Sequence, residues 1–488
     1  MANLVTLQDD FGAGVKRDAR RDKMPKGSLW WSEDLLPVLS YAGQSAGFRE
    51  RGGYSFFSAD ISTTVATTSY VVAGIVPPSW SGIHVIVDED FRVIKLGSDG
   101  AVTDVAAGPS LASQNPVFHR DMVILPGSTP KKVTNAAGTL TVASLGGSPP
   151  ASTYATVFND RTLLARGTSA NLNRLWFSDP GDPEGWDTTN TYWDFSNDII
   201  GLASLKTAVL VFHDSYVSRL RGTTPPPGTD FFADDPLWSV GCSDARSIAY
   251  WNDRVLFASP EGIFITDGAG VDDVTVKTGM LSWWQETMAS YAASTYTITA
   301  GVLRDFCFIT VMDGTTLKVG AMIDLRRLAW WPVTNIKARC MYGAQAAADE
   351  LYFGNRDTDR VSKLSTVFMP SSTVKNDGDG TAVTGLWETP FYRGSFGEKS
   401  WKRLRLTHYL RDYATDNPTV SIGYILTPED TSYTALSTTF AENTAEDGAR
   451  APLGFASSGA AFQFTRANAG DWQVAGLEAD VHNRESSR

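Results

Sequence analysis

The sequence has few of the residues that usually build stapled or metal-bound folds. It contains 3 cysteines in 488 residues, Cys242, Cys307 and Cys340, and none of them forms a Cys-x-x-Cys pair. This pattern predicts neither a disulfide framework nor a structural zinc site. Cys307 lies in the apolar run FCFITV, which predicts a buried thiol. We therefore expect the chain to be made and folded in a reducing cytoplasm.

Long apolar runs and helical periodicity are also scarce. No stretch of about 18 apolar residues occurs, and the first residues, MANLVTLQDDFGAGVKRD, lack the apolar core of a signal peptide. The sequence thus predicts no membrane span. Apolar residues at helical spacing occur only in 279–293 and, less regularly, in 27–42.

Catalytic motifs are missing as well. The sequence contains no phosphate-binding G-x-x-x-x-G-K-[ST] loop, no H-E-x-x-H zinc motif and no G-x-S-x-G elbow. We expect no catalytic residue, no metal ligand and no cofactor. The histidines are scattered without ligand spacing, at His84, His119, His213, His408 and His482.

Two stretches invite a stronger interpretation. Asp377 and Asp379 have the spacing of the first calcium-loop ligands, but no Glu follows at the required distance. The phrase FSDPGDPEGW (177–186) is similar to the Asp-box turn of sialidase propellers, although its spacing differs and it occurs once. A sialidase also needs an arginine triad, a tyrosine nucleophile and an acid in one pocket. Sequence alone cannot bring such groups together, so glycoside hydrolysis stays an alternative.

Apolar and aromatic residues are plentiful. Hydrophobic residues make up 42% of the chain and aromatic residues 11%, including 15 Trp and 16 Tyr, which favours large packed or contact surfaces. The net charge is −12. This excess of acid fits ordinary solubility, or an acidic wall along which nucleic acid slides without binding.

Short phrases of one kind recur between Thr63 and Pro370. The stretch AYWNDRVLFASPEGIFITDGAG (249–270) has two apolar runs bounded by turns, which predicts a β-hairpin. Similar phrases recur at intervals of roughly 35 to 55 residues, which bracket the length of a four-stranded blade. We therefore predict an all-β fold with a β-propeller of about seven blades over 59–370. Unrelated hairpins in a sandwich are the alternative.

Three segments flank the predicted propeller. Residues 371–380 are rich in Gly, Asp and Ser, which predicts a linker. Phrases in 381–488 alternate apolar and polar residues, which predicts a C-terminal β-sandwich. Residues 1–58 match no blade and predict an extended N-terminal arm, laid along the propeller or along a neighbouring copy.

The predicted arm carries the basic stretch KRDARRDK. Such a stretch could touch DNA, stay solvated, or pair with the acidic surface of a partner subunit. The net charge of −12 favours the partner subunit. The candidate inter-subunit residues are Lys16, Arg17, Arg20, Arg21 and Lys23.

Several phrases resemble virion proteins of tailed bacteriophages. The chain opens with an Asp-Phe-x-x-Gly phrase, continues with a Pro/Gly-Leu stretch, and reaches an Arg-x-Gly-Tyr turn in which Gly-Gly stands where Pro-Gly is common. WFSDPGDPEGWD and the closing FQFTRANAGDWQVAGLEADV also resemble segments of those proteins. The matching residues are Asp10, Phe11 and Gly14, then Pro25, Gly27 and Leu29, then Arg49, Arg51, Gly52, Gly53 and Tyr54.

The resemblance implies a structural subunit of the tail, of nozzle or tail-hub type. Such proteins look like propellers decorated with β-domains and assemble as a ring of six around the DNA channel. The implied partners are further copies, the tail adaptor, other tail proteins or fibres, and double-stranded DNA that passes without sequence recognition. The implied location is the virion tail, after assembly in the host cytoplasm. A minor tail protein of a long-tailed phage and a carbohydrate-binding or carbohydrate-hydrolysing propeller are the alternatives.

A ring of this kind predicts two further sets of residues. Acidic turns would line its lumen and repel DNA, with candidates Asp88, Glu89, Asp90, Asp234, Asp235, Asp272 and Asp273. The loop GTTPPPGTDFFADDP (222–236) would act as a gate or clasp a neighbour, stiffened by its prolines and tipped by its phenylalanines. Its candidates are Pro225, Pro226, Pro227, Phe231 and Phe232.

Overall fold

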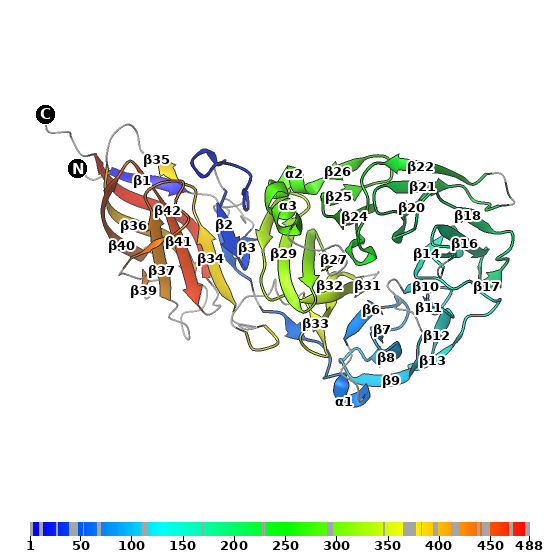
Figure 1. Ribbon diagram of the computed structural model, residues 1–488. Helices are drawn as coiled ribbons and strands as arrows, with labels where there is room; N and C mark the ends of the chain where they lie inside the picture. The colour runs from blue at the N-terminus through cyan, green and yellow to red at the C-terminus, as the bar shows by residue number, and fades with distance from the viewer. Residues whose placement is uncertain are drawn as a thin grey trace.

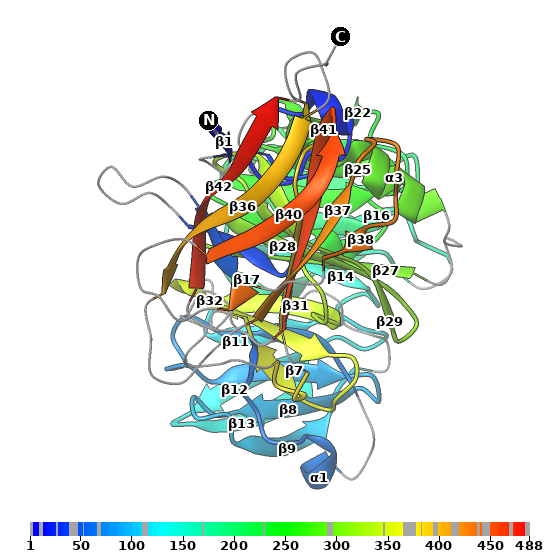
Figure 2. The same ribbon diagram turned by 90° about the vertical axis from the view of Figure 1, so that its left-hand side faces the viewer.

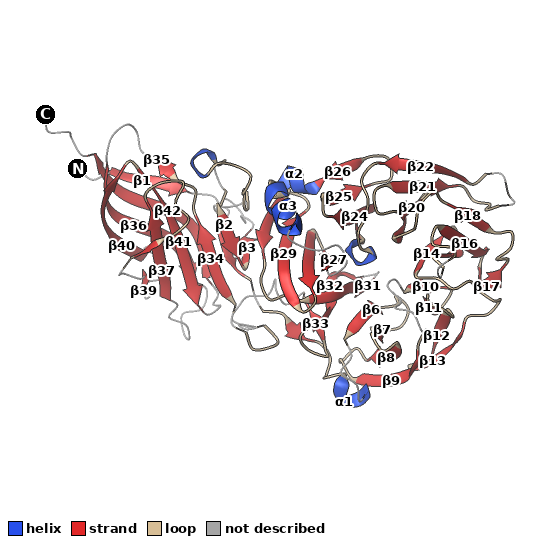
Figure 3. Cartoon of the chain, in the orientation of Figure 1, coloured by secondary structure: helices blue, strands red, loops and turns tan. Residues whose placement is uncertain are grey.

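Antiparallel strands dominate the chain (Figures 1 and 3). No helix in the described part of the chain is long and apolar enough to cross a membrane. The computed structural model describes residues 3–8, 13–25, 28–38, 47–51, 53–65, 70–109, 116–167, 170–226, 228, 230–289, 296–344, 347–364, 377–381, 383–393, 399–410, 419–436, 440–441, 449–467 and 472–483.

Seven sheets of four strands, one of them with a short fifth strand, form a ring, which confirms the predicted all-β propeller (Figure 1). Blade 1 contains β6 (Val71–Ile75), β7 (His84–Asp88), β8 (Arg92–Leu96) and β9 (Val102–Ala107). Blade 2 contains β10 (Val117–His119), β11 (Met122–Leu125), β12 (Lys131–Ala136) and β13 (Thr139–Ser144). Blade 3 contains β14 (Tyr154–Phe158), β15 (Arg161–Ala165), β16 (Arg174–Asp179), β17 (Asp182–Trp186) and the short β18 (Tyr192–Asp194).

The remaining blades follow the same plan. Blade 4 contains β19 (Gly201–Ser204), β20 (Val209–Phe212), β21 (Val217–Arg221) and β22 (Phe232–Trp238). Blade 5 contains β23 (Ala249–Trp251), β24 (Arg254–Ser259), β25 (Gly262–Thr266) and β26 (Val271–Asp273). Blade 6 contains β27 (Tyr296–Leu303), β28 (Phe306–Asp313), β29 (Thr316–Asp324) and β30 (Ala329–Pro332). Blade 7 contains β31 (Ala338–Ala344), β32 (Ala347–Asn355), β33 (Val361–Lys363) and β5 (Ser55–Phe56).

A recurring turn explains how the inner hairpins form. The phrase Asn-Asp-Arg occurs in blades 3 and 5, and Asn159, Asp160, Asn252 and Asp253 all hold φ between 44° and 56°. Two successive residues with positive φ make the turn whose twist matches antiparallel strands. Asn and Asp tolerate this conformation better than most residues, so the turn is encoded locally in these two blades.

Blade 7 closes the ring with a strand from the other end of the chain. In the described residues, β5 pairs with β33 through Phe56 opposite Ser362 and Ser55 opposite Lys363. The seam between blades 7 and 1 is packed by aromatic side chains, with the Phe57 ring stacked 4.6 Å from His84. The added strand covers the outer edge of β33 and completes the fourth position of the blade.

The C-terminal strands form a two-sheet sandwich, which Figure 2 shows in front of the propeller. One sheet has the order β3-β4-β42-β36-β40, with β1 also on β42; the other has the order β2-β34-β41-β37-β38, with β35 on β41 and β39 on β37. Their N-terminal strands are β1 (Asn3–Gln8), β2 (Trp31–Glu33), β3 (Leu35–Val38) and β4 (Gly47–Glu50). Their C-terminal strands are β34 (Thr384–Glu388), β35 (Tyr392–Arg393), β36 (Lys399–Leu410), β37 (Thr419–Ile425), β38 (Thr434–Ala435), β39 (Phe440–Ala441), β40 (Ala449–Ser457), β41 (Gly459–Ala467) and β42 (Trp472–Asn483).

This arrangement corrects the predicted N-terminal arm. Residues 1–58 supply four strands to the sandwich and one to blade 7, so the propeller is inserted into the sandwich. The helical interpretation of 27–42 was also wrong, because β2 and β3 lie there and pair with distant strands. The helices are α1 (Ser62–Val65), α2 (Val274–Thr278) and α3 (Leu281–Ala289), with short 3-10 turns η1 (Arg21–Lys23) and η2 (Ala245–Ser247).

A buried arginine joins the two segments through which the chain enters and leaves the propeller. This junction is here called the neck. Arg51 is 0% exposed. Its Nη1 and Nη2 donate to the two carboxylate oxygens of Asp377, at 2.7 and 2.8 Å, and its Nε donates to Asp34 at 2.6 Å. The entering and leaving segments are therefore held together by a bidentate ion pair. An apolar cluster that includes Trp330 of blade 6 and Trp387 of the sandwich continues across the same junction.

Candidate functional site

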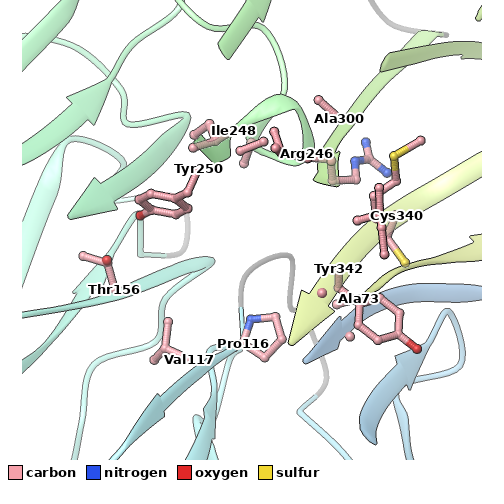
Figure 4. Close-up of a pocket in the computed structure, with 18 of the residues that line it drawn as sticks. Ala73, Pro116, Val117, Thr156, Arg246, Ile248, Tyr250, Ala300, Cys340 and Tyr342 are labelled. Carbon is pink, nitrogen blue, oxygen red and sulfur yellow. The ribbon is translucent and has the colours of Figure 1, made fainter. Parts of the chain in front are cut away.

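The inner strands of all seven blades surround one cavity of about 750 Å³ on the propeller axis (Figure 4). Small residues such as Ala155, Ala300 and Gly74 line its wall. A Cβ atom on Gly74 would lie 2.5 Å from the ring of Tyr342. Glycine at this position thus lets the inner strands of blades 1 and 7 pack closely beside the cavity.

Polar side chains in the cavity wall satisfy one another. The hydroxyl of Tyr250 accepts the backbone N–H of Ser204 at 3.0 Å, and the Ser204 Oγ lies 2.7 Å from the Oγ1 of Thr156. Arg246 donates from Nε and Nη2 to the carboxylate of Asp244, at 2.9 and 2.7 Å. Because these groups already have partners, the cavity wall is stable without a ligand.

The cavity is too narrow to carry duplex DNA. At about 3.3 Å per residue the inner strands span roughly 20 Å, so a cavity of about 750 Å³ along them is only a few ångströms in radius. The major groove of B-DNA alone is about 12 Å wide. Any DNA channel built from this protein must therefore lie between several copies.

Acidic candidates in the turn after β7 belong to the fold of blade 1. Asp88 is 0% exposed, and its Oδ1 accepts the backbone N–H of Arg92 at 2.8 Å. Glu89 forms an ion pair with Arg339 of blade 7 at 2.5 Å. Asp90 is exposed in the same turn. The first two carboxylates therefore close a turn and join two blades.

The other acidic candidates also have partners within the same chain. None of the seven lines the axial cavity, so an acidic lumen would have to form between copies. Their partners are Arg219 and Arg221 for Asp234, Ser196 and Ser218 for Asp235, Lys277 for Asp272, and the backbone N–H of Val276 for Asp273.

The base of the predicted clasp loop is rigid. Asp230 accepts hydrogen bonds from the hydroxyl and backbone N–H of Thr223 and from the backbone N–H of Thr224, at 2.6 to 3.0 Å. These bonds lower the pKa of Asp230 to about 2. Phe231 is buried, with its ring 5.1 Å from that of Phe177. This phenylalanine therefore anchors the loop to blade 3 and is not an exposed tip.

The outer part of the loop has one exposed apolar group. Phe232 is 49% exposed, and the guanidinium of Arg221 lies 4.5 Å from its ring. Pro225 is buried and Pro226 is half-buried, while Pro227 lies outside the described residues. Only Phe232 of the described loop candidates is thus placed to meet another molecule.

Two residues of the basic stretch, Lys16 and Arg21, bind to other parts of the same chain. The Lys16 Nζ donates to the carbonyl of Thr278 at 2.7 Å. Arg21 is buried and forms an ion pair with Glu388 at 3.0 Å. Burial lowers the pKa of Arg21 to about 10, which leaves it charged at neutral pH. Lys16 and Arg21 therefore hold the N-terminal segment against α2 and β34, and they are not available to a partner subunit.

The other three basic candidates point outward. Arg17, Arg20 and Lys23 are exposed. The guanidinium of Arg17 lies 5.1 Å from the ring of Trp31, which restricts its motion. In the basic stretch, Lys16 and Arg21 therefore make contacts within the chain, whereas Arg17, Arg20 and Lys23 are accessible to other molecules.

The described residues hold no group of three or more His, Cys, Asp and Glu side chains placed to bind a metal ion. Asp377 and Asp379, the calcium-loop candidates, accept hydrogen bonds from Asn335, and Asp377 also pairs with Arg51. All three cysteines are free and buried. Burial raises the pKa of the Cys307 thiol to about 12, so it is a weak nucleophile at neutral pH.

Comparisons with known proteins find matches among solved structures. No family model and no curated protein matches the sequence. The WD40 domain of Pan2 from Neurospora crassa matches with 8% identity and a TM-score of 0.41, over 64% of this chain and 95% of its own. The WD40 β-propeller domain of Doa1 matches with 9% identity and a TM-score of 0.40, over 64% and 96%. YCF48 from Cyanidioschyzon merolae matches with 12% identity and a TM-score of 0.40, over 64% and 98%.

One feature of the site was not predicted from the sequence as such. The neck pair of Arg51 and Asp377 joins residues that are far apart in sequence, and the only signal was that both stood in phrases already singled out.

Proposed function

We propose that this protein is a structural subunit of a bacteriophage tail, of nozzle or tail-hub type, that assembles as a ring around the DNA channel. The observation that carries the proposal is that residues of the phage-like phrases act together at one place. Gly14, Arg51 and Tyr54 all lie where the sandwich meets the propeller. A junction held by specific side chains fixes the sandwich on the propeller, as a structural building block requires.

The contacts of these residues explain why their types matter. Gly14 has φ of +68°, and a Cβ atom there would lie 2.9 Å from the carbonyl oxygen of Trp330. The backbone N–H of Tyr54 donates to Asp377 at 3.1 Å, beside the Arg51 ion pair. Gly14, Arg51 and Tyr54, which come from two of the phrases that resemble virion proteins, therefore belong to one junction.

The width of the axial cavity supports a ring of several copies. A bore of a few ångströms excludes duplex DNA, so the proposed channel is enclosed by neighbouring chains. The proposed partners are further copies, six in the ring that the resemblance implies, together with the tail adaptor, other tail proteins or fibres, and the passing DNA. The proposed location is the virion tail.

Mass measurement of the purified protein, followed by negative-stain imaging, tests this proposal. We expect rings with an opening wide enough for duplex DNA, six copies being the number implied. Incubation with a panel of glycans is the companion assay, because the axial cavity is the place where a carbohydrate-active propeller would bind. A protein that stays monomeric and hydrolyses a glycan would overturn the proposal.

A further inference from the structure

The axial cavity, which is too narrow for duplex DNA, has the size of a small-molecule site. Its volume is about 750 Å³, and pockets that bury a small ligand measure about 300 to 1,000 Å³. Each inner strand pairs with one strand of its own blade among the described residues, so its other edge faces the cavity. Because small residues such as Ala73, Ala155 and Gly301 line the wall, the N–H and C=O groups of these edges are accessible to a ligand.

An exposed aromatic ring stands on this wall. Tyr250 is 52% exposed although it belongs to the inner strand β23, and its ring lines the cavity (Figure 4). The hydroxyl of Tyr250 is fixed at 3.0 Å by the backbone N–H of Ser204. A ring that is held in place with half of its surface open offers a platform for a flat ligand ring, and little conformational entropy is lost when the ligand binds.

A guanidinium on the wall keeps part of its hydrogen-bonding capacity. Arg246 donates from Nε and Nη2 to Asp244, at 2.9 and 2.7 Å, whereas its Nη1 has no hydrogen-bond partner among the described residues. Arg246 lines the same cavity, and Figure 4 shows it on the side of Cys340 and Ala300. A guanidinium oriented by a bidentate pair is well suited to bind a carboxylate, sulfonate or phosphate oxygen through its remaining N–H groups.

The charges of the wall favour an anionic ligand over a cationic one. Among the residues that line the cavity, Arg246 and Arg304 are basic and Glu350 is acidic. The carboxylate of Glu350 accepts the Tyr352 hydroxyl at 2.6 Å and forms an ion pair with Lys363. Its charge is therefore compensated within the protein, and a cationic ligand would find no open carboxylate on this wall.

We propose that the axial cavity binds a small organic anion that carries a planar ring. The ligand ring lies against Tyr250, and its anionic group accepts hydrogen bonds from the Nη1 of Arg246. Backbone groups at the edges of the inner strands bind the other polar atoms of the ligand. This inference goes beyond the proposed function and does not depend on the ring of copies, because every group named belongs to one chain.

Two matched dyes test the site. Anilinonaphthalene sulfonate and the neutral phenylnaphthylamine share their rings and differ in the sulfonate. In fluorescence titrations we expect one sulfonate dye per chain, bound about tenfold or more tightly than the neutral dye. Tyr250→Ala should weaken both dyes about tenfold. Phe232→Ala is the control, because it removes a ring of similar exposure, 49%, that does not line the cavity, and it should bind both dyes like the parent.

A second set of variants tests the anion-binding group. Arg246→Gln with Asp244→Asn removes both charges of the pair, so no uncompensated charge stays in the wall. We expect the preference for the sulfonate dye to fall below about twofold, while the neutral dye still binds. Arg246→Lys keeps a cation for Asp244 but lacks the Nη1 donors, and it should also lose most of the preference. Circular dichroism identifies any variant that fails to fold, and Arg246→Lys then decides if the double variant does fail.

The outcomes separate this inference from the proposed function. Equal affinity of the parent for the two dyes, parent-like binding by Tyr250→Ala, or weak binding of several dyes per chain would overturn the cavity inference. A protein that assembles into rings but binds neither dye would remove this inference alone. A protein that binds the sulfonate dye as expected but never forms rings would leave the cavity inference standing and remove the proposed function.

Discussion

The propeller and the sandwich are built from the same kind of strand but from different distances along the chain. Blades 1 to 6 each take their strands from one continuous stretch, with turns of a few residues. In the sandwich, by contrast, β1 pairs with β42, so that Asn3 lies opposite Val481. Blade 7 is intermediate, because it borrows β5 from the N-terminal segment.

The difference shows where this fold depends on specific tertiary contacts. A blade hairpin needs only alternating apolar residues and a compatible turn. Distant segments instead lose more chain entropy when they meet, so side chains at the neck and the seam between blades 7 and 1 must hold them. Changes at these two places should therefore cost more than equivalent changes within a blade.

Removing the neck arginine is expected to have the largest effect. Arg51→Ala leaves Asp34 and Asp377 buried without their cation, and breaking a buried pair in this way costs about 3 to 5 kcal/mol. Urea denaturation measures the loss in the free energy of unfolding. Arg326→Ala is the control: Arg326 also forms an ion pair, with Asp305, but its side chain is 70% exposed, so we expect a cost of at most about 1 kcal/mol. Equal losses of unfolding free energy in the two variants would contradict the expectation that the buried neck pair stabilises the protein more than an exposed pair does.

Two glycines at matching turns separate the seam from an ordinary blade. Gly100 and Gly138 both precede the fourth strand of a blade, with φ of +81° and +89°. Alanine at either site is strained, by about 1 to 2 kcal/mol. At Gly100, however, the added Cβ would lie 1.8 Å from the carbonyl oxygen of Phe57, while nothing lies within 4 Å at Gly138. We expect Gly100→Ala to lose about 1 to 3 kcal/mol more than Gly138→Ala, as measured by thermal unfolding.

The seam should also be sensitive to acid. His84 is 2% exposed and stacks on Phe57, and burial lowers its pKa to about 4. Between pH 6.5 and 4 the unfolded chain therefore binds more protons at His84 than the folded chain. The contribution of neutral His84 to the free energy of unfolding is thus full above pH 6.5 and falls as pH is lowered. At pH 5 the loss in the free energy of unfolding is about 2 kcal/mol. His84→Phe should flatten this part of the stability profile, and an unchanged profile would place the acid sensitivity elsewhere.

The success of sequence analysis follows the same division. The hairpin at 249–270 was predicted because its turns and strands are neighbours in the chain, and the structure has β23, β24 and β25 there. The segment 27–42 was interpreted as partly helical because its apolar spacing is ambiguous. Its strands, β2 and β3, are decided by partners such as Trp387 of β34, which no local pattern reveals.

The candidate residues show the same limit at the level of side chains. Their types were read from the sequence, but their directions depend on packing. Phe231 and Phe232 are adjacent, yet the first is 6% exposed and the second 49%. Likewise Arg21 is buried beside Glu388 while Arg20 is exposed. Alternation along a strand or turn predicts that neighbours differ, whereas only the tertiary fold decides which one is outside.

A turn inside a single blade should give the smallest and most local effect. Asn252 holds φ of 44° in the hairpin between β23 and β24. Asn252→Ala should cost about 1 to 2 kcal/mol, whereas Asn252→Gly, which adopts this conformation freely, should cost little. Hydrogen exchange provides the decisive measurement, because a locally encoded blade predicts reduced protection in β23 and β24 with the sandwich strands unchanged. Loss of protection at β36 and β42 would mean that the blades and the sandwich unfold as one unit. The difference between locally paired blades and the distantly paired sandwich would then have no effect on how the protein unfolds.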